Sequence, residues 1–182
     1  MEFSSKLIET AVNEISKLPG IGKRTALRLV LFLLRQPSDQ SDDLAKAISE
    51  MRHKVKFCKN CHNICDNELC DICSNPNRDN SVICVVEDIR DVMAIENTSS
   101  YKGMYHVLGG LISPLDGINP ENLNIDSLLL RLEDVDEIVL GVEASSEGDV
   151  TNLYLSNVLK NLHILINFDI IFSRRTLMHF DK

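Results

Sequence analysis

The sequence has 182 residues, of which 44% are hydrophobic and 25% charged, and its formal net charge is −8. This length suits one ordinary domain with small modules. No apolar run could cross a bilayer and no signal peptide is visible, so we expect a soluble, cytoplasmic protein without membrane contact.

The negative net charge argues against nonspecific nucleic-acid binding by the whole surface. The charge is unevenly distributed, however. Residues 1–60 carry 11 lysines and arginines against 7 aspartates and glutamates, whereas residues 61–182 carry 8 against 20. Phosphate contact is therefore expected through the amino-terminal end only.

The first third of the chain predicts three helices. Residues 5–17 space their apolar side chains for one face of a helix, and the sequence Leu-Pro-Gly-Ile-Gly at 18–22 ends it. A second helix is expected over 25–34 and a loop over 37–41. Asp42 or Asp43 is expected to cap a third helix that runs to about residue 54.

A helix, the sequence Pro-Gly-Ile-Gly and a second helix are typical of a helix-hairpin-helix. The glycines permit backbone geometry closed to other residues, and the amides that start the second helix favour an anion. This predicts a clamp on the DNA backbone that reads charge and not bases. The alternative is an ordinary αα-hairpin with a solvated basic face. The residues expected to bind DNA are Gly20, Gly22, Lys23, Arg24 and Arg28.

Two Cys-x-x-Cys pairs follow, separated by eight residues. Each pair brings two thiolates to one side of a turn, and together they supply the tetrahedral shell of a structural zinc ion. Unrelated thiols or a redox disulfide are less favoured, because disulfides are rare in a reducing compartment. The predicted ligands are Cys58, Cys61, Cys70 and Cys73. Cys65 is interpreted as a spare thiol and Cys84 as a small core residue.

From residue 81 onward, β-branched runs at 81–87 and 137–142 predict strands buried on both faces of a parallel sheet. Shorter strands are expected at 104–107 and 164–172, and helices at 88–95, 125–132 and 149–162. Strands that alternate with helices indicate an α/β sheet. His106 lies in an apolar strand and is interpreted as a core histidine, whereas His62 stands beside a cysteine and could compete for zinc.

Carboxylates follow two of the predicted strands, at Glu87 and at the Glu147-Gly-Asp149 sequence. Carboxylates at neighbouring strand ends can converge on a magnesium ion. Isolated acidic residues at such positions are more often solvated caps. The sequence shows no nucleophile–base pair and no phosphate-binding GxxxxGK[ST] loop.

In this order the motifs resemble the RecR family of bacterial recombination mediators. The resemblance covers roughly residues 5–162. It is carried by the glycine motif, by the knuckle ending Cys-Asp-Ile-Cys-Ser, and by Val-Val-Glu-Asp-Ile-Arg-Asp-Val-Met-Ala-Ile-Glu at 85–96. The most diagnostic stretch is Tyr-His-Val-Leu-Gly-Gly-Leu-Ile-Ser-Pro-Leu-Asp-Gly-Ile-Asn-Pro-Glu-Asn-Leu at 105–123.

The resemblance implies an α+β multi-module protein, with a helix-hairpin-helix at 1–56, a four-cysteine zinc finger at 57–74 and a Toprim domain at 81–175 with a mainly parallel sheet. It implies a DNA-binding protein that is not an enzyme. Such a protein would work with RecO and RecF, helping to load RecA on single-stranded DNA coated with single-strand-binding protein during gap repair. It would form a dimer or a tetrameric ring, and be nucleoid-associated when on DNA.

Three departures from the family pattern stand out. Toprim enzymes hold magnesium with a glutamate and an Asp-x-Asp pair; Glu87 matches the glutamate, but the pair reads Glu147-Gly-Asp149. Glu143-Ala144 stands where the family usually has Asn-Pro. Residues 163–182 form an atypical tail in place of the family's glycine-rich carboxyl end, on which ring formation is expected to depend.

Because the Asp-x-Asp pair is missing, magnesium is less strongly predicted than zinc. Glu87 and Asp91 are interpreted as partner-contact or structural residues. Two alternatives to the mediator remain: a magnesium-dependent nuclease or primase of the wider Toprim group, and a zinc-stabilised protein-interaction scaffold. Loss of activity on Glu87→Gln would favour the enzyme, and absence of DNA binding would favour the scaffold.

Overall fold

The structure is a computed structural model, and it describes residues 4–160, 162 and 164–167. The chain divides into two compact units, residues 1–54 and 55–182. None of the described helices combines the length and the apolarity that a membrane span requires.

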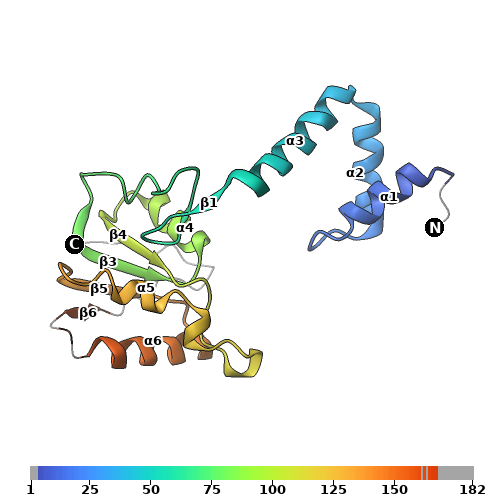
Figure 1. Ribbon diagram of the computed structural model, residues 1–182. Helices are drawn as coiled ribbons and strands as arrows, with labels where there is room; N and C mark the ends of the chain where they lie inside the picture. The colour runs from blue at the N-terminus through green and yellow to red at the C-terminus, as the bar shows by residue number, and fades with distance from the viewer. Residues whose placement is uncertain (1–3, 161, 163, 168–182) are drawn as a thin grey trace. The chain divides into compact units, whose positions relative to one another are not determined.

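The amino-terminal unit consists of three helices, α1 (Lys6–Ile15), α2 (Lys23–Arg35) and α3 (Ser38–Lys54) (Figure 1). The α1 and α2 helices pack together around Val12, Ala26 and Val30. Their apolar residues recur at helical spacing, so each helix has one apolar face, and these two faces pack against each other. The two predicted helices that flank the glycine motif are thereby confirmed.

The third helix begins earlier than the sequence suggested. Residues 37–41 were expected to form a loop with a cap at Asp42 or Asp43, but α3 already starts at Ser38. Pro37 directly precedes its first residue, and the Pro37 carbonyl accepts a hydrogen bond from the Gln40 amide at 3.2 Å. The six consecutive polar residues at 38–43 are typical of a loop, but a helix whose described side chains are all solvent-accessible tolerates them.

The second unit opens with a small zinc knuckle, defined here as residues 55–75. Its strands β1 (Lys56–Phe57) and β2 (Ile64–Cys65) pair antiparallel, with Lys56 opposite Cys65 and Phe57 opposite Ile64. This hairpin was not predicted, because two-residue strands carry no measurable periodicity.

In the part of this unit that the structure describes, a four-stranded parallel sheet forms the body, in the order β4-β3-β5-β6 (Figure 1). Its strands are β3 (Asp79–Val86), β4 (Gly103–Val107), β5 (Glu137–Gly141) and β6 (Leu165–Asn167). Its α-helices are α4 (Ile89–Thr98), α5 (Ile125–Leu129) and α6 (Ser146–Leu159). Two short 3₁₀ helices, η1 (Pro114–Asp116) and η2 (Pro120–Asn122), precede α5.

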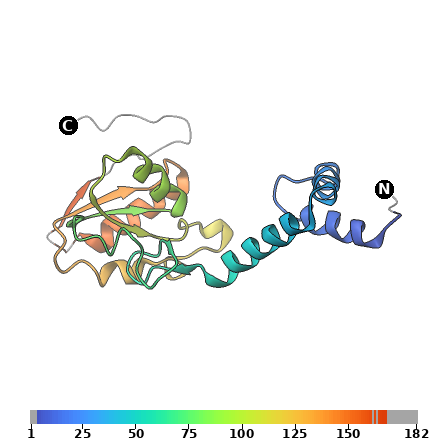
Figure 2. The same ribbon diagram turned by 90° about the horizontal axis from the view of Figure 1, so that it is seen from above.

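Both faces of the sheet are covered, as Figure 2 shows from above. Ile83 and Val85 of β3 pack with α5 and α6, whereas Cys84 and Val86 pack with α4 on the other face. This explains the unbroken apolar run of β3 and confirms the prediction of a strand buried on both faces. It also confirms Cys84, which is 1% exposed, as a core residue.

The last described strand, β6, pairs with β5 from Leu165 to Asn167. Ile164 and Ile166 would be an aggregation hazard if they failed to reach the sheet, but both pack partly buried against its core. The remainder of the strand predicted at 164–172 falls outside the described residues, as do most of the atypical tail (163–182) and the end of the Toprim range (81–175).

Candidate zinc centre and nucleic-acid interface

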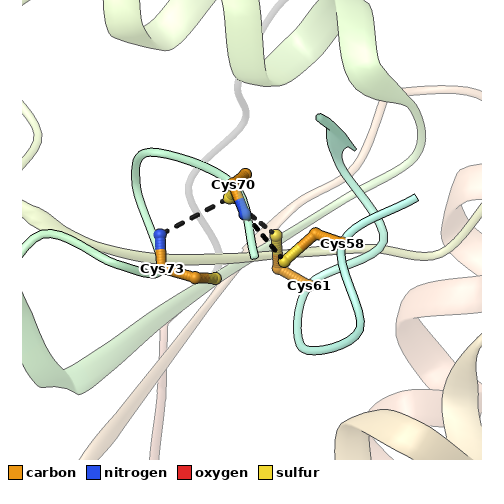
Figure 3. A group of neighbouring side chains, drawn as sticks. All are labelled: Cys58, Cys61, Cys70 and Cys73. Atoms are coloured by element: carbon orange, nitrogen blue, oxygen red, sulfur yellow. Dashed lines mark hydrogen bonds between the residues drawn. The ribbon is translucent and has the colours of Figure 1, made fainter. Parts of the chain in front are cut away.

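Four cysteine sulfurs converge in the knuckle, as Figure 3 shows. The Sγ atoms of Cys58, Cys61, Cys70 and Cys73 all lie within 4.8 Å of one another. The first three cysteines are buried and Cys73 is half-buried. The sulfurs of Cys61 and Cys70 are 3.5 Å apart. Four closely spaced sulfurs match the closed tetrahedral shell of structural zinc, which leaves no open position for a substrate.

The pKa values of the clustered thiols indicate that they need a cation to ionise together. The contact with the Cys70 sulfur, together with burial, raises the pKa of Cys61 to about 12. The contacts with the Cys61 and Cys70 sulfurs likewise raise the pKa of Cys73. Hydrogen bonds from the Cys61 and Cys73 thiols instead lower the pKa of Cys70. One sulfur of the cluster therefore ionises while its neighbours keep their protons, and a divalent ion is what allows them all to be thiolates.

The knuckle is joined to the sheet beside a pair of histidines. The Val107 amide of β4 donates to the Cys61 carbonyl at 2.8 Å. The His62 ring lies edge-on to the His106 ring, with centroids 5.3 Å apart, and its Nε2 is 2.7 Å from the Ser127 hydroxyl. His62 thus packs against the sheet and α5, which gives it a structural role in place of the zinc competition considered from the sequence.

His106 is a satisfied core histidine, as expected. It is fully buried, its Nε2 lies 2.7 Å from the Asn124 carbonyl, and its Nδ1 lies 3.0 Å from the Arg131 guanidinium. Burial lowers its pKa to about 4.

The glycine motif forms a tight turn before α2. Gly20 has φ +79°, a left-handed conformation that favours glycine, whereas Gly22 has φ −80° and serves as the N-cap of α2. A Cβ at either glycine would meet no atom of the described residues within 4 Å. Only Gly20 therefore needs glycine for its backbone geometry, and the expectation that Gly22 also needs it was wrong.

The basic residues after this turn are open to solvent. Lys23, Arg24 and Arg28 lie on the first two turns of α2, and each is exposed. Among the described residues none of the three forms an ion pair. The first amides of a helix lack intrahelical partners and carry partial positive charge. The start of α2 therefore offers an anion the partial positive charge of the backbone amides and the full positive charge of the flexible basic side chains.

The predicted acidic residues lie near the carboxyl ends of β3 and β5. Glu87 follows β3 and is half-buried; burial and the charges of Asp91, Asp88 and Glu143 raise its pKa. Asp91 accepts the Asp88 amide at 2.9 Å and thereby completes the capping box of α4. Within the described part of the chain, these carboxylates do not form a group of three close enough to share an ion.

The Glu147-Gly-Asp149 sequence occupies the first turn of α6, which starts at Ser146 and not at Asp149 as predicted. Ser145 caps it by accepting the Gly148 amide at 3.0 Å. A Cβ at Gly148 would lie 1.9 Å from the Glu143 carbonyl oxygen, so this position admits glycine alone. Sequence reasoning missed both Ser145 and the packing role of Gly148, although a serine just before an acidic first helical turn is a recognisable cap signal.

Comparison with known proteins gives the same arrangement of modules. Residues 8–52 match the family described as RecR, helix-hairpin-helix, residues 55–75 match the RecR zinc finger domain with four cysteines, and residues 81–168 match Toprim domain. The Recombination protein RecR of Flavobacterium psychrophilum is 56% identical over 167 residues, which cover 91% of this chain and 81% of that protein. The chain belongs to the RecR family.

Other RecR proteins agree to a similar degree. The Recombination protein RecR of Flavobacterium johnsoniae is 57% identical over 169 residues, 92% of this chain and 82% of the relative. That of Amoebophilus asiaticus is 53% identical over 169 residues, 92% of this chain and 84% of the relative. Family membership confirms the α+β fold class with its helix-hairpin-helix, zinc finger and Toprim modules, and with the four sulfurs it identifies a site for one structural zinc ion.

Proposed function

We propose that this chain is a non-catalytic mediator of recombinational DNA repair that grips the DNA backbone through its helix-hairpin-helix. One observation carries the proposal: the start of α2 presents exposed Lys23, Arg24 and Arg28 beside the Gly20 turn. Free amides combined with cations in this way are suited to binding phosphate. The names of the relatives, Recombination protein RecR, support the same role.

In this role the chain would help to load RecA onto single-stranded DNA coated with single-strand-binding protein, working with RecO and RecF in gap repair. DNA is its ligand in the bacterial cytoplasm, at the nucleoid. The carboxylates at the carboxyl edge of the sheet are the groups that we assign to protein partners, because they are poorly suited to phosphate. Glu87, Glu147 and Asp149 are the contact residues proposed there, whereas Asp91 supports the start of α4.

We also propose that the chain works as a homo-oligomer, a dimer or a tetrameric ring. The amino-terminal unit buries few of its apolar side chains. Leu44, Ile48 and Met51 recur on one face of α3 and are 47%, 56% and 58% exposed. An apolar stripe of this kind on a soluble helix marks an interaction surface.

Binding of single-stranded DNA by the Arg24→Ala/Arg28→Ala double variant tests the DNA interface. Fluorescence anisotropy across a salt series should show weaker binding to every DNA sequence alike. The slope of log affinity against log salt should fall by about 0.7 for each phosphate of the single strand that the variant no longer neutralises.

Arg35→Ala is the matched control, because Arg35 is also exposed but lies in the last turn of the same helix. It should bind DNA as the parent chain does. An unchanged affinity of the double variant at low salt would show that the hairpin is not the DNA interface.

A further inference from the structure

We propose that a cavity between the zinc knuckle and the carboxyl end of the sheet receives an unpaired base of single-stranded DNA. The cavity has a volume of about 440 Å³, within the range of roughly 300–1,000 Å³ that is typical of small-molecule sites. Its lining residues are Phe57, His62, Asp88, Ile89, Val107, Gly109 and Asn124. The inference rests on the proposed function, since it assumes that the chain meets single-stranded DNA.

An exposed aromatic ring stands at this cavity. Phe57 is 67% exposed, although it lies in a strand and directly precedes the zinc ligand Cys58. Its pairing with Ile64 and the burial of Cys58 fix the backbone from which the ring projects. Exposed aromatic rings of this kind serve as stacking platforms for the bases of single-stranded nucleic acids, independently of sequence.

The polar groups of the lining suit the edge of a base. Asp88, Asn124 and His62 contribute a carboxylate, an amide and an imidazole, while Ile89 and Val107 supply apolar walls. These groups are held in place: the Asn124 amide donates to the Val107 carbonyl at 3.0 Å, and Asp88 forms an ion pair with Arg90. A wholly apolar side chain of a partner protein would desolvate them without offering new hydrogen bonds, which is costly.

The negative charge around the cavity favours entry of a base over entry of a phosphate. Asp88 on the lining, its neighbour Glu87 and Asp91 three residues further along give three carboxylates against the one guanidinium of Arg90, and this excess of negative charge disfavours a phosphate inside the cavity. A base is uncharged, so it escapes this repulsion. Its flanking phosphates would remain outside, where Lys56 and Lys59 are exposed on either side of Phe57 in the chain. The exposed pair of Lys59 with Glu68, at 2.9 Å, is weak enough to be exchanged for a phosphate.

The test compares the zinc-loaded full chain on two fluorescent strands of equal length. One strand carries bases, and the other has abasic sugar-phosphate units throughout. We expect the strand with bases to bind between about fivefold and a hundredfold more tightly. Phe57→Ala should abolish most of this difference while leaving the affinity for the abasic strand unchanged, and Phe57→Tyr should retain it.

Leu69→Ala is the control, because Leu69 is an exposed apolar residue of the same knuckle, 37% exposed, that does not line this cavity. It should keep the preference for bases. Equal affinity of the parent chain for the two strands would overturn the proposal, and so would a preference that survives in Phe57→Ala. Loss of binding to a protein partner in Phe57→Ala with the base preference intact would instead assign the cavity to a protein side chain.

The outcome is separable from that of the proposed function. Arg24→Ala/Arg28→Ala should weaken binding of both strands by the same factor, because it removes positive charge that faces phosphates. If that variant binds normally while Phe57→Ala loses the preference for bases, the result supports base binding in the cavity and contradicts the hairpin as the DNA interface.

Discussion

His106 shows how its neighbours fix the proton of a buried side chain. The Arg131 guanidinium can only donate, so Nδ1 of His106 must accept. The proton therefore sits on Nε2, which donates to the Asn124 carbonyl at 2.7 Å. The ring is neutral, and burial lowers its pKa from 6.5 to about 4. Folding is thus linked to the protonation of this one residue.

The unfolded chain binds a proton at His106 below about pH 6.5, whereas the folded chain does so only below about pH 4. Stability from this residue is therefore complete above pH 6.5 and is lost as pH falls from 6.5 toward 4. We expect a loss of about 3 kcal/mol over this window, measured by urea unfolding of the zinc-loaded protein.

Other groups titrate in the same range, so the comparison is with His106→Gln, which cannot take up the proton. Its unfolding free energy should be lower at pH 7 and should depend less on pH. If the unfolding free energies of the two proteins changed with pH in parallel, this would contradict a buried neutral histidine.

At the residue scale, glycines also differ in what they do. Gly20 provides a left-handed turn, Gly22 caps α2 in an ordinary conformation, and Gly148 leaves room for the Glu143 carbonyl. The sequence shows three glycines near charged residues, but only the backbone around them distinguishes a turn from a close approach.

At the scale of elements, the zinc knuckle depends on its metal because it has little else to fold around. Its hydrophobic cluster consists of the cysteines themselves, with Ile72 packed against them. In such small modules the free energy of metal binding is free energy of folding. The hydrogen bond from Val107 to Cys61 extends this dependence to the end of β4, an edge strand of the sheet.

We expect Cys70→Ser to hold far less than the one zinc per chain of the parent, measured by metal analysis after purification. We expect this variant to lose about 3 kcal/mol of unfolding free energy, which is small compared with the free energy of structural zinc binding. Such a loss would lower the melting temperature by roughly 6–12 °C.

Cys65→Ser is the matched control. Cys65 lies in the same knuckle, but its sulfur donates to the Asn67 carbonyl at 3.0 Å and is not one of the four converging sulfurs. It should keep its zinc and nearly all of its stability. Equal zinc loss in the two variants would contradict the ligand set.

At the scale of the whole molecule, the two units differ in how well each covers its apolar surface. The second unit encloses the sheet between helices on both faces. In the first unit, α3 buries none of its side chains. A helix that exposes its apolar stripe gains little from tertiary packing, which is the main source of helix stability in proteins. A second copy of the chain is the partner proposed to cover it.

Size-exclusion chromatography with light scattering checks this proposal. We expect a mass of at least twice the 20.5 kDa of one chain, and a shift toward one chain in Ile48→Glu. The control is Leu115→Glu, because Leu115 is 97% exposed but lies outside the first unit. A single-chain mass for the parent protein, or equal dissociation by the control, would rule out α3 as the contact.

Much of the fold could be predicted because its signals are local. The apolar run of β3, the spacing of α1 and the two Cys-x-x-Cys pairs each reflect contacts within a few residues or a strict periodicity. Element boundaries were less accurate: α3 and α6 start earlier than expected, because polar residues in a first helical turn resemble a loop.

Residue types and short spacings were enough to predict the modules, their order and the zinc ligands, because they specify a metal shell or a helix start. The positions of distant residues relative to one another became known from the folded structure alone. His62 reaches Ser127 across 65 positions of the chain, and Phe57 shares a cavity with Asn124. Such contacts arise from the packing of the knuckle on the sheet, and no periodicity along the chain encodes them.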